Sequence, residues 1–179
     1  MTKNHKRNIN EKQFGHKYKL YCPDEDKRFI CFYCGDSAPT IDHVPSLNCI
    51  HDLRLEYEIE NYFKVPCCSE CNSFASDEPH LDIFERRNFI KEKIKKKYKR
   101  ILMLPDWDDN EINSMGPSFR KSLKAQMDYK YFIAYRLLYG ETTTFYLNQI
   151  GYNNFDPRKI CKYVDPNDLQ RIENNSYYV

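Results

Sequence analysis

The sequence predicts an α+β fold, in which a small cysteine-held segment of short strands precedes a mainly α-helical C-terminal extension. Two cysteine pairs with a two-residue gap, Cys31 with Cys34 and Cys68 with Cys71, enclose strand-like stretches that glycine and proline interrupt. Beyond residue 78, apolar residues recur at helical spacing over long stretches. A chain of 179 residues can bury the core of one such domain.

Residues 1–21 are predicted to form a basic N-terminal arm. The first twenty residues contain six Lys or Arg and one Glu, and no helical or strand period is sustained. We expect such a polar segment to be flexible until a partner orders it. The chain has no apolar stretch long enough for a membrane span or a signal peptide, which predicts a cytoplasmic, intracellular protein with no membrane partner.

Residues 22–78 are predicted to form the compact motif. Strand-like stretches occupy Phe29–Tyr33, Thr40–Val44 and Tyr62–Val65, and Gly and Pro separate them. A short helix is expected to begin near Ser69. The motif therefore consists of short antiparallel strands, two cysteine knuckles and one helix.

The cysteine spacing predicts a structural zinc ion. Two Cys-x2-Cys knuckles supply four thiolates for a tetrahedral site, and disulfides are rare in a reducing compartment. A motif this small buries little apolar surface, and structural zinc can contribute on the order of 10 kcal/mol or more to its folding. Cys67 is an alternative to Cys68, although it breaks the matched spacing. The assigned ligands are Cys31, Cys34, Cys68 and Cys71.

Residues 79–179 are predicted to be a helical extension, with a basic helix at about 80–103, a second helix at about 117–139 and a C-terminal tail. Nine of the sixteen residues from 85 to 100 are Lys or Arg, whereas residues 24–62 carry nine Asp or Glu against three Lys or Arg. Basic segments beside an acidic centre suit a polyanionic partner. The residues expected to contact nucleic acid are Arg86, Arg87, Lys91, Lys95 and Lys99.

A polar sequence between the knuckles carries a family resemblance. Thr40-Ile41-Asp42-His43-Val44-Pro45 follows the first knuckle, Glu60-Asn61 and Val65-Pro66 come next, and Asn72 directly follows the last cysteine. This order resembles the HNH nucleases, especially their zinc-containing branch, which includes the phage enzyme that resolves branched DNA. The resemblance extends over about Phe29 to Asp77.

The resemblance implies a ββα-metal motif and a DNA endonuclease that hydrolyses phosphodiester bonds with one divalent cation, Mg²⁺ or another. In that family the residue matching Asp42 binds the cation, and the residue matching Asn72 completes the protein ligands. His43 matches the general base that activates water, and Asn61 matches an asparagine that braces the loop carrying this histidine. Many members place a basic residue and a glycine where this chain has Ala75 and Ser76.

The same residue types suit this chemistry on physical grounds. A hard cation prefers oxygen ligands, and a histidine with an ordinary pKa near 6.5 is mostly neutral at physiological pH and can accept a proton. Side chains of adjacent strand residues point to opposite faces, so Asp42 and His43 can face one site only if the strand is distorted. We therefore expect a bulge or bend near Pro45.

Two other functions remain open at this stage. A zinc module that binds nucleic acid without cutting it would need only the knuckles and the basic segments. An RNA-directed nuclease would use the many aromatic residues for base stacking. A nuclease with one active centre per chain cuts one strand at a time, so cleavage of both strands would favour a homodimer.

Overall fold

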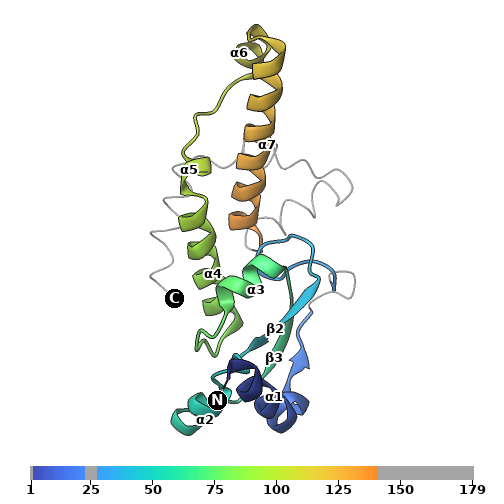
Figure 1. Ribbon diagram of the computed structural model, residues 1–179, viewed down its shortest axis with the longest axis vertical. Helices are drawn as coiled ribbons and strands as arrows, with labels where there is room; N and C mark the ends of the chain where they lie inside the picture. Colours follow the sequence, from blue (N-terminus) through green and yellow to red (C-terminus); the bar gives the residue numbers. More distant parts are fainter. Residues whose placement is uncertain (1, 23–27, 141–179) are drawn as a thin grey trace. The chain divides into compact units, whose positions relative to one another are not determined.

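The computed structural model describes residues 2–22 and 28–140, and the chain divides into two compact units (Figure 1). Unit 1 extends to Ile94, and unit 2 begins at Lys95. The division falls inside a helix, α4 (Ile83–Lys97).

A three-stranded sheet forms the centre of unit 1. It consists of β1 (Lys19–Leu20), β2 (Thr40–Val44) and β3 (Phe63–Cys67), in the order β1-β3-β2. β2 runs antiparallel to β3, whereas β1 runs parallel to it. The predicted strand at Phe29–Tyr33 is reduced to a single bridge between Ile30 and Ser37.

The pairing of β2 with β3 gives the hairpin a buried face and an open face. Asp42 pairs with Val65, and His43 pairs with Lys64, within an unbroken register. Asp42 and Val65 are buried, whereas His43 and Lys64 are only half-buried, as strand alternation requires. No bulge interrupts the pairing of β2 with β3, so the adjacent Asp42 and His43 face opposite ways. The predicted bend is present just beyond β2, where the backbone bends at Pro45 and the Val44–Pro45 peptide bond is cis.

Four helices and a short turn surround this sheet. Ser69–Ala75 is helical as predicted, with Cys68 at its N-cap. The residues between β2 and β3 also contain a helix that the sequence analysis did not predict. In chain order these elements are α1 (Lys3–Phe14), the 3₁₀ turn η1 (Gly15–Lys17), α2 (Ile50–Glu56), α3 (Ser69–Ala75) and α4.

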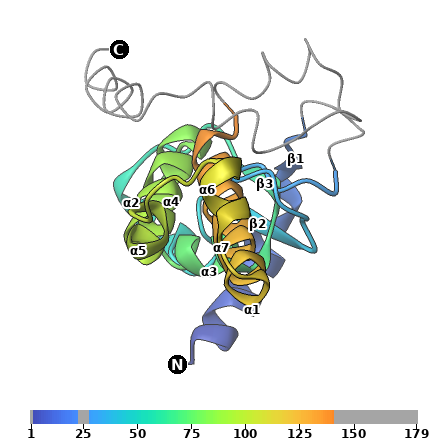
Figure 2. The same cartoon turned by 90° about the horizontal axis from the view of Figure 1, so that it is seen from above.

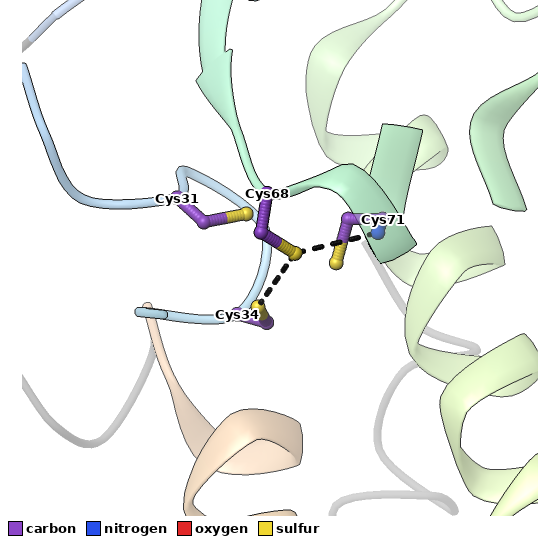
Figure 3. A group of neighbouring side chains, drawn as sticks. All are labelled: Cys31, Cys34, Cys68 and Cys71. Atoms are coloured by element: carbon purple, nitrogen blue, oxygen red, sulfur yellow. Dashed lines mark hydrogen bonds between the residues drawn. The ribbon is translucent and has the colours of Figure 1, made fainter. Parts of the chain in front are cut away.

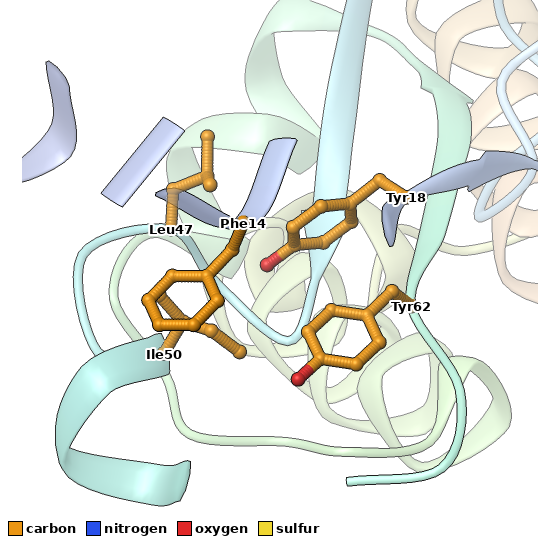
Figure 4. Close-up of a cluster of buried hydrophobic side chains, with 5 residues drawn as sticks. All are labelled: Phe14, Tyr18, Leu47, Ile50 and Tyr62. Carbon is orange, nitrogen blue, oxygen red and sulfur yellow. The ribbon is translucent and has the colours of Figure 1, made fainter. Parts of the chain in front are cut away.

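The N-terminal segment is part of the folded unit. Phe14 at the end of α1 packs with Tyr18, Leu47, Ile50 and Tyr62 in a buried cluster (Figure 4). Cation–π contacts lie at its edge, since the guanidinium of Arg54 lies 5.4 Å from the centre of the Phe14 ring. The prediction that residues 1–21 form a flexible arm therefore does not agree with the structure, because α1 buries an aromatic side chain against the motif.

Unit 2 is helical in the part that the structure describes. It contains α5 (Lys99–Leu102), α6 (Asp109–Ser114) and α7 (Pro117–Leu138), and α5 and α6 both contact α7 (Figures 1 and 2). The predicted second helix matches α7, whose first residue is the expected proline. The predicted tail beyond residue 140 lies outside the described residues. No described helix has the length and apolar character needed to cross a membrane.

Candidate active site and metal-binding cluster

The two knuckles meet where β3 ends and α3 begins. Cys31 and Cys34 lie in the loop before β2, and Cys68 and Cys71 lie at the start of α3 (Figure 3). The first knuckle turns tightly, since the Gly35 amide donates to the Cys31 carbonyl at 2.9 Å and Gly35 has φ 75°. Glycine adopts this left-handed conformation without a steric penalty. The second knuckle is shaped by helix α3 itself.

The four thiols converge closely enough to hold one metal ion. Their sulfur atoms all lie within 4.8 Å of one another, and all four side chains are buried. Four thiolates this close would repel each other strongly, so a cation that neutralises them suits the arrangement. Tetrahedral coordination by four cysteines is typical of structural zinc.

Cys67 does not belong to this group. Its thiol donates to the carbonyl of Cys68 at 3.3 Å, and the four grouped ligands are those with the matched two-residue gaps. The Cys68 sulfur instead accepts the Cys71 amide at 3.4 Å, which caps α3. Hydrogen bonds from the neighbouring thiols, Cys31 first, lower the pKa of Cys68 below its ordinary value.

Asp42 lies on the buried face of the hairpin, where a guanidinium and a phenol already bind its carboxylate. Arg86 Nε donates to Oδ2 at 2.7 Å and Arg86 Nη2 donates to Oδ1 at 3.1 Å, while the Tyr33 hydroxyl donates to Oδ2 at 2.6 Å. Asp42 is 5% exposed and Arg86 is 0% exposed. Burial, followed by the negative charge of Asp42, raises the pKa of Tyr33, so the phenol stays protonated.

Arg86 also ties the segment between α3 and α4 to the hairpin. Its Nη1 donates to the Glu78 carbonyl at 2.8 Å, and its Nη2 donates to the Ser76 carbonyl at 3.3 Å. Burial opposes its charge, but the hydrogen bonds and charge of Asp42 outweigh burial and raise the pKa of Arg86 above its ordinary value. This buried ion pair was not predicted from the sequence.

Asn72 joins α3 to β2 on the same side of the hairpin. Its Nδ2 donates to Thr40 Oγ1 at 3.3 Å, and the Thr40 hydroxyl donates to the Cys67 carbonyl at 2.7 Å. Thr40 and Asp42 are two residues apart on β2, so both side chains lie on the face of the hairpin that α3 contacts. Asn72 and Asp42 thus lie on the same side of the hairpin.

The arrangement around Asp42 does not fit a cation-bound carboxylate. A carboxylate offers about four acceptor positions, and three are taken by donors from Arg86 and Tyr33. The adjacent guanidinium also neutralises the charge that would attract a divalent cation. Among the described residues, the only group of three or more His, Cys, Asp or Glu side chains placed to share a metal ion is the cysteine cluster.

His43 lies on the open face, and an aromatic neighbour holds its ring. The Tyr18 ring meets it edge-on, with centroids 4.9 Å apart, and the Tyr18 hydroxyl donates to the Pro45 carbonyl at 2.7 Å. Burial, and then the positive charge of Lys64, lower the pKa of His43 to about 4. The imidazole is therefore neutral at physiological pH, and the lowered pKa makes it a weaker base than an ordinary histidine.

Asn61 does not brace the loop after His43. It is exposed, and no side-chain hydrogen bond joins it to that loop in the residues that the structure describes. Two residues that sequence reasoning missed do so instead. The Tyr18 hydroxyl binds the Pro45 carbonyl, and Asn10 Nδ2 donates to the Leu47 carbonyl at 2.6 Å. Asn10 is buried. Its position four residues before Phe14, on the same face of the helix, was the feature of the sequence that could have indicated this burial.

The basic helix presents fewer cations to solvent than its sequence predicts. Arg86 is engaged by Asp42, and Arg87 is 7% exposed, with its guanidinium 4.0 Å from the Phe32 ring centre and bonded to the Phe32 carbonyl. Both arginine side chains point inward, so the structure does not agree with the prediction that they contact nucleic acid. Lys91 is half-buried, while Lys95 and Lys99 are exposed.

Comparisons with protein-family models, with curated proteins and with solved structures found no match for this chain. The likeness to the HNH nucleases therefore depends on the residues quoted above.

Proposed function

We propose that the chain is a zinc-stabilised nuclease of the HNH type that hydrolyses phosphodiester bonds in DNA. The observation that supports this most is the position of His43 on an antiparallel hairpin, which leads directly into α3 through a four-cysteine cluster. This is the order of hairpin, zinc knuckle and helix that the resemblance implies. The zinc ion would stabilise the motif and take no part in the chemistry.

His43 would act as the general base. Its neutral imidazole accepts a proton from a water molecule as the water oxygen bonds to phosphorus and the bond from phosphorus to the 3′-oxygen breaks. The departing 3′-oxygen takes a proton from solvent, which leaves a 3′-hydroxyl and a 5′-phosphate. Tyr18 keeps the ring in place, because its edge-on contact and its bond to Pro45 fix both the imidazole and the loop that follows it.

A catalytic divalent cation such as Mg²⁺ is part of what the resemblance implies, with Asp42 and Asn72 as its ligands. The Asp42 carboxylate is neutralised by Arg86 here, so the chemistry above starts from His43. Asp42 also faces away from His43, so a cation held by Asp42 and Asn72 would not lie at the phosphorus that His43 serves, and no step is assigned to it.

The buried pair of Asp42 and Arg86 favours a second candidate function. If Asp42 serves only to hold Arg86, the chain is a zinc module that binds nucleic acid without cutting it. This candidate predicts salt-sensitive binding and no turnover.

A cleavage panel separates these functions. Duplex DNA, branched DNA and RNA are incubated with the protein in Mg²⁺, Mn²⁺ or EDTA, and products are separated on denaturing gels. We expect DNA cleavage, and His43→Ala should lower the rate by about 10²- to 10⁴-fold, the usual contribution of a general base. The EDTA samples show whether a divalent cation takes part. His51→Ala is the matched control, because His51 is exposed in α2.

Folding and zinc content are measured beside activity. His43→Ala should keep the far-UV circular dichroism spectrum and the zinc content of the parent, since its side chain does not belong to the cysteine cluster. Undiminished cleavage by His43→Ala would contradict the assigned base. Binding without cleavage under every metal condition would favour the non-catalytic module, and preferential cutting of RNA would change the substrate.

A further inference from the structure

The open face of the hairpin carries cations beside His43 that no step above uses. Cross-strand partners share a face, so the pairing of Leu20 with Lys64 and of His43 with Lys64 defines a row across all three strands. Leu20 is 49% exposed at one end of this row, and Lys64 and His43 are half-buried. Solvent can therefore reach this row, in contrast with the buried row that contains Asp42.

Lys64 is the direct neighbour of His43 in this row. Side chains that face each other on antiparallel strands have Cβ atoms about 4.5–5.5 Å apart. The positive charge of Lys64 is one of the causes that lower the pKa of His43. In the part of the chain that the structure describes, no carboxylate forms an ion pair with Lys64. A cation beside a neutral imidazole is suited to hold an anion while the imidazole takes a proton.

Helix α1 brings a second cation to the same place. Asn10 and Phe14 fix α1 against unit 1, and Arg7 lies on the same side of the helix, one turn before Asn10 and two turns before Phe14. Arg7 is exposed, and its charge acts on His43 in the same direction as that of Lys64. Glu11, one turn further along α1, acts in the opposite direction. Asp42 also acts in the opposite direction, but it faces the other side of the hairpin and is paired with Arg86. The charges of Lys64, Arg7 and Glu11 on this side sum to one positive charge.

We propose that Lys64 and Arg7 form a phosphate-binding site beside His43, which holds the backbone phosphate of the DNA that the chain cuts. The inference rests on the proposed nuclease function and names the residues that position its substrate. It also assigns a task to α1, which docks Arg7 at the open face. Glu11 limits the affinity of this site, because its carboxylate repels phosphate.

The proposal is tested by binding, in a protein that does not cut. His43→Ala serves as the parent, and fluorescence anisotropy measures its Kd for a short labelled DNA duplex over a range of salt concentrations. Lys64→Gln and Arg7→Gln should each weaken binding several-fold and reduce the slope of log K against log salt by about 0.9, the value for one lost phosphate contact. Lys64→Arg should restore both quantities, because it keeps the charge.

Two exposed positions on α1 provide matched controls. Lys12→Gln removes the same charge from a different side of the helix, so it should change Kd and the salt slope less than Arg7→Gln. Glu11→Gln removes the repelling carboxylate and should tighten binding. Circular dichroism and zinc content show whether each variant is folded.

The outcomes separate this inference from the proposed function. If Lys64→Gln and Arg7→Gln match their parent in both Kd and salt slope, the phosphate site is overturned even where His43→Ala abolishes cleavage. An equal effect of Lys12→Gln and Arg7→Gln would overturn the role of Arg7, because only net charge would then matter. Weakened binding by both variants, with cleavage unaffected by His43→Ala, would support the phosphate site and reject His43 as the base.

Discussion

Replacing Arg86 with methionine should destabilise unit 1 strongly, because it leaves the Asp42 carboxylate buried without its countercharge. The pair is 0% and 5% exposed, and the guanidinium makes four hydrogen bonds to Asp42, Ser76 and Glu78. Removing one partner of a buried ion pair costs about 3–5 kcal/mol. A loss of that size lowers the folding equilibrium constant by about 10²- to 10⁴-fold.

A double-mutant cycle isolates the pair. Asp42→Asn keeps an oxygen that can accept the Tyr33 hydroxyl but removes the charge, and Arg86→Met removes the guanidinium. The double variant contains no buried charge at this site, so it should be more stable than Arg86→Met alone, with a coupling free energy in the range of about 0.5–3 kcal/mol.

Urea unfolding followed by far-UV circular dichroism gives the free energies of the four proteins. Hydrogen exchange of the β2 and β3 amides then shows whether the loss lies in unit 1. Arg86→Lys is the matched control, since it keeps the charge without the paired N–H donors, and it should lose less than the methionine variant. A loss below about 1 kcal/mol for Arg86→Met would refute the reasoning, because such a value is typical of an exposed ion pair.

Three further predictions concern the parts that hold the candidate site in place. Cys68→Ala should lose zinc and much of the folded structure of unit 1, while Cys67→Ala should keep one zinc ion per chain. Elemental analysis measures the zinc content and thermal melts measure the stability of each variant. The reverse result would assign Cys67 as the ligand in place of Cys68. Asn10→Ala should lower stability by about 1–3 kcal/mol, because the carbonyl it binds is left buried without a donor; an unchanged melting temperature would mean that α1 is not docked. Tyr18→Phe keeps the ring beside His43 but removes a hydroxyl bond, so cleavage should slow while DNA affinity is unchanged; a loss of affinity with a normal rate would contradict a positioning role.

The cysteine spacing predicted its grouping well because ligand geometry is local. The two-residue gap brings both sulfurs of a knuckle to one side, and the close approach of Cys31 and Cys34 to Cys68 and Cys71 then requires only that β3 return beside β2. Helices α3 and α7 were also predicted near their observed bounds, since each begins at a recognisable start residue.

The role of α4 was misjudged because charge was taken as a sign of exposure. The buried residues of α4 are Ile83, Arg86, Arg87, Ile90 and Ile94, which recur at the spacing of one helix face. The two arginines lie inside the apolar stripe that the isoleucines define, and this position was available in the sequence. The partner was not, because nothing local to Asp42 indicates that a residue 44 positions away will neutralise it.

The buried ion pair has a thermodynamic consequence for any cation at Asp42. A divalent ion that takes this carboxylate has to displace the guanidinium, and the cost of leaving a buried charge unpaired is about 3–5 kcal/mol. Only molecules in which the guanidinium has left the carboxylate can bind the cation, so the apparent affinity is the intrinsic affinity multiplied by the fraction of such molecules. This cost therefore weakens cation binding by about 10²- to 10⁴-fold. The free protein should then bind Mg²⁺ far more weakly than a site whose carboxylate is not already paired with a guanidinium. Substrate phosphate would have to supply the missing ligand and charge, so tight Mg²⁺ binding without nucleic acid would contradict the pairing of Asp42 with Arg86.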